Sequence, residues 1–147
     1  MLSAPQRHIF VYGTLLSGEQ RDINRLKPAP RWLGRARVPG VLYDLGDYPG
    51  MRLGGQGLVL GEVYEISEEL ERVLDAVEEV WPQQSGEYTK REVSVRLDGE
   101  VLDQPDDPVD ELACLVYEIA PERVSDGRRI DSGDWVSLRK SRAGRIA

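Results

Sequence analysis

The stretch HIFVYGTLL, residues 8–16, organises the rest of the chain. Residues 9–12 have high strand propensity, and they run directly into Gly13 and Thr14. Gly13 can adopt backbone angles that are closed to other residues, and it lets a ligand approach the main chain closely. A strand that ends in this way directs free N–H groups and one hydroxyl outward, which suits a small anion such as a carboxylate. An ordinary strand-to-loop turn has the same pattern, so both interpretations stay open from this stretch alone.

The composition is typical of a soluble globular protein. The chain has 147 residues, of which 40% are hydrophobic and 31% are charged. A chain of this length can bury a working core, so we expect residues 1–147 to form a single domain. The formal net charge of −7 argues against a nucleic acid partner, because such partners require a basic surface. Residues 139–147 hold four basic side chains, which we interpret as a frayed, solvated end.

The scarcity of cysteine and histidine argues against disulfides and metal sites. The one cysteine, Cys114, cannot form an intrachain disulfide, and its apolar neighbours indicate a buried structural thiol. The lone His8 has no cysteine or histidine cluster around it, so we expect no metal site. No apolar run approaches the roughly 20 residues needed to cross a membrane. Since the N-terminus also lacks a signal-peptide core, we expect a cytoplasmic protein with no membrane partner.

Strand and turn patterns alternate along the chain. We expect strands at about 8–12, 31–38, 41–45, 58–66, 88–97 and 112–119, a turn at Pro39-Gly40, a glycine-rich turn at 54–57 and a short helix at 18–26. The stretch 112–119 is apolar on both faces, which places it centrally in the sheet. Together with the helix described next, this pattern predicts an α+β fold with a small mixed, largely antiparallel and barrel-like sheet.

The clearest helix begins after Ser67, which can cap it, and it carries two glutamates in its first turn near the positive end of the helix dipole. Its apolar residues recur at helical spacing: Leu70, Val73, Leu74, Val77 and Trp81. Pro82 is expected to end it.

Glu78 on this helix is the candidate catalytic residue. With about 100° per residue, Glu78 falls at about +80° from Leu70, on the shoulder of the apolar stripe. The other acids fall at or beyond about 100°: Glu68, Glu71, Asp75 and Glu79. We therefore expect Glu78 to be the helical acid nearest the core, with a pKa above its ordinary value of about 4.3, as a general acid and base requires. The alternative is an amphipathic helix whose edge carries a glutamate that reaches water.

Two tyrosines are candidates for the wall of a ligand pocket. Tyr48 lies in a turn rich in glycine and proline that can present its ring to a ligand, although a packed turn explains it equally well. Tyr88 lies on the strand face opposite Val93 and Val95.

Several segments, in this order and spacing, resemble the γ-glutamylcyclotransferase-like family, which includes AIG2-like proteins and γ-glutamylamine cyclotransferases. The segments are residues 12–15, 41–46 with 48–49, 61–64, 74–78, 88–90 with Val93 and Val95, and 133–135. The resemblance runs from about residue 8 to 136. It implies a small β-barrel flanked by helices, and a cavity around the loop Tyr12, Gly13, Thr14 and Leu15. It also implies an essential glutamate, which maps onto Glu78.

The resemblance further implies an enzyme that converts a γ-glutamyl amide to 5-oxoproline and a free amine, without a cofactor. Its partner would be a small γ-glutamyl substrate. Three departures stand out: Glu79 where the family usually has glycine, Lys90 where it commonly has arginine, and a longer stretch at 80–87. They keep two alternatives open, a non-catalytic binding protein for a small amino-acid-like ligand and a different lyase or acyl-transfer reaction in the same cavity.

Overall fold

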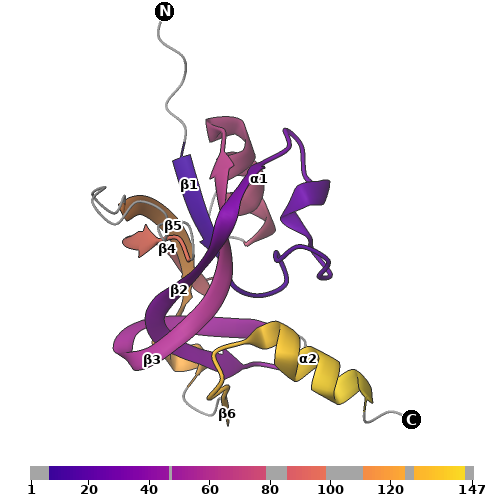
Figure 1. The fold of residues 1–147 in the computed structure, drawn as a ribbon, viewed down its shortest axis with the longest axis vertical. Coiled ribbons are helices and arrows are strands. Elements are labelled where there is room, and N and C mark those ends of the chain that lie inside the picture. The colour runs from indigo at the N-terminus through magenta and orange to yellow at the C-terminus, as the bar shows by residue number, and fades with distance from the viewer. Residues whose placement is uncertain (1–6, 47, 79–85, 99–110, 125–127, 145–147) are drawn as a thin grey trace, which may run out of the picture.

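The structure, a computed structural model, describes residues 7–46, 48–78, 86–98, 111–124 and 128–144. Within these residues the elements are β1 (Arg7–Val11), η1 (Ile23–Arg25), β2 (Arg31–Asp44), β3 (Pro49–Ile66), α1 (Glu68–Val77), β4 (Tyr88–Arg96), β5 (Glu111–Ile119), η2 (Pro121–Arg123), β6 (Arg128–Arg129) and α2 (Trp135–Gly144), where η denotes a short 3-10 helix. The six strands form one sheet in the order β4-β5-β1-β3-β2-β6 (Figure 1).

The sheet is mixed and curls into a half-barrel, which confirms the predicted α+β class. The pair β1 and β5 is parallel, and the other neighbouring pairs in the described chain are antiparallel. The curl brings the end of β4 to β2, where Ala36 and Leu97 form an antiparallel bridge. The Asp98 N–H donates to the Arg35 carbonyl at 2.7 Å beside this bridge. The strand β5 lies between β4 and β1, so its predicted central place is confirmed.

Hydrophobic residues pack on both faces of β1 because its side chains alternate. Phe10 belongs to a buried cluster inside the curl of the sheet, with Val63 and Met51 of β3. Ile9 and Val11 belong to a second cluster, which contains Leu70 and Leu74 of α1. The strand β1 is therefore covered on both sides, and the chain leaves it directly into the loop that starts at Tyr12.

The strands β2 and β3 differ from the prediction, because each is one long strand. The expected turn at Pro39-Gly40 is instead a shift of register, at which Pro39 pairs with Leu58 and Gly40 with Leu53. Residues 54–57 of β3 loop out between these pairs, and Gly54 has a φ of +89°. Proline has no N–H to donate to the neighbouring strand, and the bulge explains why Pro39 is tolerated within β2. The glycine-rich turn is thus a bulge within a strand.

The ends of the helices also differ from the prediction. The Ser67 side chain caps α1 as expected, by accepting the Leu70 N–H at 3.1 Å. However, α1 ends at Val77 with Glu78 as its C-cap, so Pro82 does not end it, and residues 79–82 lie outside the described part of the chain. The expected helix at 18–26 is reduced to the three residues of η1.

The C-terminal segment forms α2 where a frayed end was predicted. The Asp134 carboxylate accepts the N–H groups of Val136 and Ser137, which caps the first turn. Trp135 anchors this turn, since only 3% of it is exposed. Arg139 and Arg142 then form ion pairs with the body of the protein, the latter with Asp44. These contacts explain Arg139 and Arg142 better than solvation does.

Two further expectations concern Cys114 and membranes. Cys114 is completely buried, and burial raises the pKa of its thiol to about 12, as expected for a structural thiol. Among the described helices, none combines the length and the apolar character that crossing a bilayer requires.

Candidate functional site

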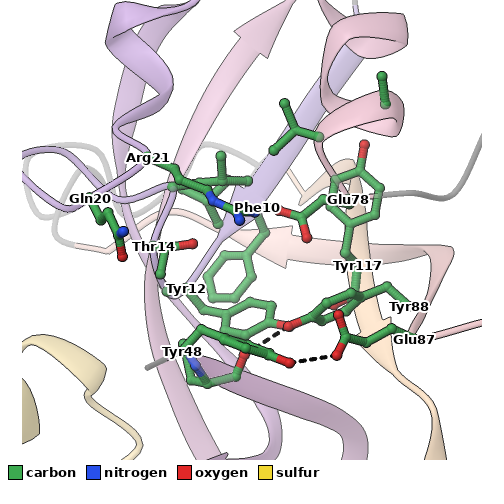
Figure 2. Close-up of a pocket in the computed structure, with 16 residues that line it drawn as sticks. Phe10, Tyr12, Thr14, Gln20, Arg21, Tyr48, Glu78, Glu87, Tyr88 and Tyr117 are labelled. Carbon is green, nitrogen blue, oxygen red and sulfur yellow. Dashed lines mark hydrogen bonds between the residues drawn. The ribbon is translucent and has the colours of Figure 1, made fainter. Parts of the chain in front are cut away.

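A pocket of about 580 Å³ lies where β1, the end of α1, the turn before β3 and the start of β4 meet (Figure 2). All the site residues predicted from sequence line it: Tyr12, Gly13, Thr14, Leu15, Tyr48, Glu78 and Tyr88. The structure therefore brings the loop and the glutamate together across more than sixty residues of sequence. Sequence reasoning missed four polar residues that also line the pocket: Gln20, Arg21, Glu87 and Tyr117.

In the loop after β1, the carbonyl groups accept hydrogen bonds from N–H groups of the same loop and of η1. The carbonyls of Gly13, Thr14 and Leu15 accept the N–H groups of Leu16, Arg21 and Ile23 at 3.0, 2.8 and 2.9 Å. By contrast, the N–H groups of residues 13, 14 and 15 donate to no acceptor among the described residues. Such a run of N–H groups at the wall of a pocket suits a small anion.

Gly13 is required for space rather than for its backbone angles. A Cβ atom at this position would lie 2.6 Å from Cγ of Pro49, which is too close for any real contact. Gly13 is not among the described glycines that have a positive φ. The side chain of Leu15 points away from solvent into the cluster beside α1, so Leu15 fixes the loop through its side chain.

Tyr12 and Tyr88 form part of the wall, and their hydroxyls are engaged. The Tyr12 hydroxyl donates to the Tyr117 carbonyl at 2.7 Å and accepts the Met51 N–H at 3.3 Å. The Tyr88 hydroxyl donates to the Pro49 carbonyl at 3.1 Å. Burial raises the pKa of both hydroxyls, and the negative charge of Glu78 adds to this in each case. Both therefore stay protonated at neutral pH.

Tyr48 pairs with Glu87, a second carboxylate in the pocket lining. The Tyr48 hydroxyl donates to Oε2 of Glu87 at 2.6 Å, and this hydrogen bond is the main reason why the pKa of Tyr48 is raised (Figure 2). Arg123 lies 3.9 Å from the same oxygen. Glu87 belongs to the stretch 80–87 that departs from the family pattern, which is why sequence reasoning gave it no role.

The prediction that Glu78 is the most buried acid of α1 is wrong. Glu71 and Asp75 are 8% and 7% exposed, whereas Glu78 is only half-buried. Nζ of Lys90 lies 2.5 Å from Glu71 and 2.9 Å from Asp75. Arg7 forms a second ion pair with Glu71 at 2.9 Å. The helical count located the buried face from apolar residues alone, and it could not include cations on the sheet that offset the desolvation of these carboxylates.

These buried charges support the pocket wall directly. Lys90 and Tyr117 are cross-strand partners on β4 and β5, so they lie on the same face of the sheet. The Tyr117 hydroxyl donates to Asp75 at 2.8 Å, and its ring lines the pocket. Burial opposes the charge of Lys90, but its hydrogen bonds to Asp75 and Glu71 outweigh burial and raise its pKa. Lys90 therefore holds the residues behind the wall and does not itself line the pocket.

Glu78 and Arg21 approach the pocket from opposite elements. Glu78 extends from the last turn of α1, where its N–H donates to the Leu74 carbonyl at 2.9 Å. Figure 2 shows the Arg21 side chain and the Glu78 carboxylate pointing toward one another above Phe10. Nothing in the local sequence around Arg21 marked it, because its place in the pocket depends on the fold of the loop.

We expect the raised tyrosine pKa values to be visible in an alkaline titration. Five tyrosines have pKa values above the ordinary 10.0: Tyr12, Tyr48, Tyr64, Tyr88 and Tyr117. The unfolded chain releases these protons near pH 10 and the folded chain holds them, so the free energy of unfolding falls as pH rises above 10. As the pH is raised, the phenolate absorbance of the folded protein should increase at higher pH than that of the denatured protein. Coincident titration curves would contradict this prediction.

The family model and the curated relatives that match this chain all carry the name γ-glutamyl cyclotransferase. The model of the family described as "Gamma-glutamyl cyclotransferase, AIG2-like" matches residues 9–137. A curated relative from Niallia circulans, named γ-L-glutamyl-butirosin B γ-glutamyl cyclotransferase, is 44% identical over 73 residues, which are 49% of this chain and 46% of the relative. A second, from Vibrio cholerae, is 40% identical over 75 residues, which are 51% of this chain and 64% of the relative. The chain thus matches about half the length of the first and under two thirds of the second.

A solved structure supports the same fold. The AIG2-like protein from Mus musculus has a TM-score of 0.62 and 28% sequence identity to this chain, and the match covers 82% of this chain and 83% of that one.

Proposed function

Because the chain belongs to the γ-glutamyl cyclotransferase, AIG2-like family, we propose that it converts a γ-glutamyl amide to 5-oxoproline and a free amine. The observation that carries the proposal is the pocket itself. Glu78 lines the same cavity as residues 13–15, whose N–H groups have no acceptor in the part of the chain that the structure describes. A proton acceptor and a set of anion-binding donors are the two elements that this reaction requires.

The substrate brings its own nucleophile. Its α-amine attacks its γ-carbonyl, a ring C–N bond forms, and the C–N bond to the leaving amine breaks. Nucleophile and electrophile share one molecule, so the protein need only hold a bent conformer. Glu78 takes a proton from the α-ammonium before the attack and returns a proton to the leaving nitrogen, and one carboxylate can do both in sequence.

The loop and the tyrosines have different roles in this proposal. The N–H groups of Gly13, Thr14 and Leu15 stabilise either the oxyanion of the tetrahedral intermediate or the substrate carboxylate. Tyr12, Tyr48 and Tyr88 shape the wall. Their raised pKa values keep their hydroxyls protonated at neutral pH, so they cannot accept a proton from the substrate. The same hydroxyls already donate hydrogen bonds to protein atoms. The other carboxylate of the lining, Glu87, already accepts the Tyr48 hydroxyl and lies 3.9 Å from Arg123. We therefore assign the proton transfers to Glu78.

The lysine at position 90, where the family commonly has arginine, is compatible with enzymatic activity. Lys90 contacts Glu71 and Asp75 and is not part of the pocket lining. Glu79 lies outside the described residues.

The test is a screen of γ-glutamyl peptides and γ-glutamyl amines for release of 5-oxoproline. We expect at least one compound to yield 5-oxoproline and free amine in equal amounts. If γ-glutamyl compounds bind but none is turned over, the protein is a binding protein for an amino-acid-like ligand, and the enzymatic proposal is wrong.

A further inference from the structure

Arg21 is the one basic side chain among the described residues that line the pocket. It belongs to the loop after β1, and it points toward Glu78 on the other side of the cavity (Figure 2). The pocket therefore presents a guanidinium and a carboxylate that face each other.

The backbone of Arg21 is held firmly although its side chain is exposed. The Arg21 N–H donates to the Thr14 carbonyl at 2.8 Å. On one side, Asp22 accepts the N–H groups of Gly18 and Asn24, both at 2.9 Å. On the other side, the buried carboxylate of Glu19 receives two hydrogen bonds from Arg139 at 2.6 and 2.7 Å. The backbone that carries the guanidinium is thus fixed, so only the Arg21 side chain has to be ordered when it binds a ligand.

We propose that Arg21 binds the α-carboxylate of the substrate while Glu78 receives its α-ammonium. This inference rests on the proposed cyclotransferase function. An amino acid head group carries both charges on one carbon atom, so it fits between an opposed guanidinium and carboxylate. Arginine suits this role because its planar group can donate two parallel hydrogen bonds to a carboxylate.

The assignment decides what the loop does. If Arg21 takes the α-carboxylate, the N–H groups of Gly13, Thr14 and Leu15 remain for the oxyanion that forms at the γ-carbonyl. It also defines the substrate class: the γ-glutamyl unit must carry a free α-carboxylate, and amides that lack this group are poor substrates whatever amine they release.

The experiment pairs a variant with a truncated substrate. The γ-glutamyl amide found in the screen is compared with the 4-aminobutanoyl amide of the same amine, which lacks only the α-carboxylate and cyclises to 2-pyrrolidinone. We expect Arg21→Gln to lower kcat/KM for the γ-glutamyl amide by about 10- to 100-fold, the usual range for a lost hydrogen bond to a charged group. For the 4-aminobutanoyl amide, parent and variant should be equal.

Arg25→Gln is the matched control, because Arg25 is an exposed arginine of η1 that does not line the pocket. It should leave both substrates unchanged. The inference is wrong if Arg21→Gln affects neither substrate, or if it affects both equally.

A binding measurement separates this inference from the reaction itself. If the parent protein turns over no γ-glutamyl compound, calorimetry with 5-oxoproline and 2-pyrrolidinone still tests Arg21. The parent should bind 5-oxoproline more tightly, and Arg21→Gln should abolish that preference, in which case the carboxylate site stands and the enzymatic proposal fails. An unchanged preference, or no binding of 5-oxoproline to the parent, overturns the inference.

Discussion

Replacement of Glu78 by glutamine is expected to lower the rate of 5-oxoproline formation by about 10²- to 10⁴-fold, the usual range for loss of a general acid and base. Glutamine has nearly the same shape and can still hydrogen-bond, but it cannot accept and return a proton at neutral pH. The substitution keeps the hydrogen bond from the Glu78 N–H to the Leu74 carbonyl. The loss should therefore appear in kcat, with the fold and most of the substrate binding retained.

Glu69→Gln is the control for charge on the same helix. Glu69 is exposed in the first turn of α1 and does not line the pocket, so its substitution should leave kcat unchanged. Glu79→Gln, at a position that the helical count places in solvent, is expected to behave in the same way. Parent-like turnover by Glu78→Gln would remove Glu78 from the mechanism.

The second large effect is on stability, and it concerns Lys90. Lys90→Met should lower the free energy of unfolding by about 2–4 kcal/mol at neutral pH, a little less than the full cost of breaking a buried ion pair because Lys90 is partly exposed. Among the described residues, the variant would leave Asp75 without a cation and Glu71 with Arg7 alone. Urea denaturation measures the loss, and Lys90→Arg should restore most of it. A Lys90→Met variant as stable as the parent would contradict this.

The contribution of Lys90 also has a defined pH range. Its pKa is raised in the folded protein above the ordinary 10.5, so its stabilisation is complete below that value and is lost as the pH rises through the folded pKa. We expect the stability difference between the parent and Lys90→Met to be constant around neutral pH and to shrink in alkaline solution above 10.5. A difference that persists there would show that packing, not charge, is responsible.

The sequence predicts the pocket better than it predicts the helix beside it. Tyr12 and Gly13 carry a local signal, because a strand end is visible in a short window. Glu78 is identified by its place at the edge of an amphipathic stripe only together with the family resemblance. The burial of Glu71 and Asp75 carries no such signal, since it depends on Lys90 and Tyr117 from strands that follow later in the chain. A helical wheel counts a carboxylate as polar, whatever cation the fold brings to it.

The long strands and the position of Arg21 were also missed, because they too depend on contacts outside a short window of sequence. Pro39-Gly40 has the composition of a turn, and only the facing bulge at residues 54–57 shows that the strand continues through it. The loop that carries Arg21 is fixed by local hydrogen bonds to Thr14 and Asp22 and also by the contact of Glu19 with Arg139, 120 residues away. Contacts of this kind are not encoded in any single stretch of sequence.

The ion pair between Glu19 and Arg139 has a consequence for the order in which the protein is made. The two residues lie 120 positions apart, and the Glu19 carboxylate has only 3% of its side chain exposed. A nascent chain therefore carries the loop of the pocket long before its partner leaves the ribosome. Until α2 has been synthesised and docked, that carboxylate has no guanidinium to receive it, and a buried unpaired charge is costly. We expect the ligand pocket to be among the last parts of the molecule to mature.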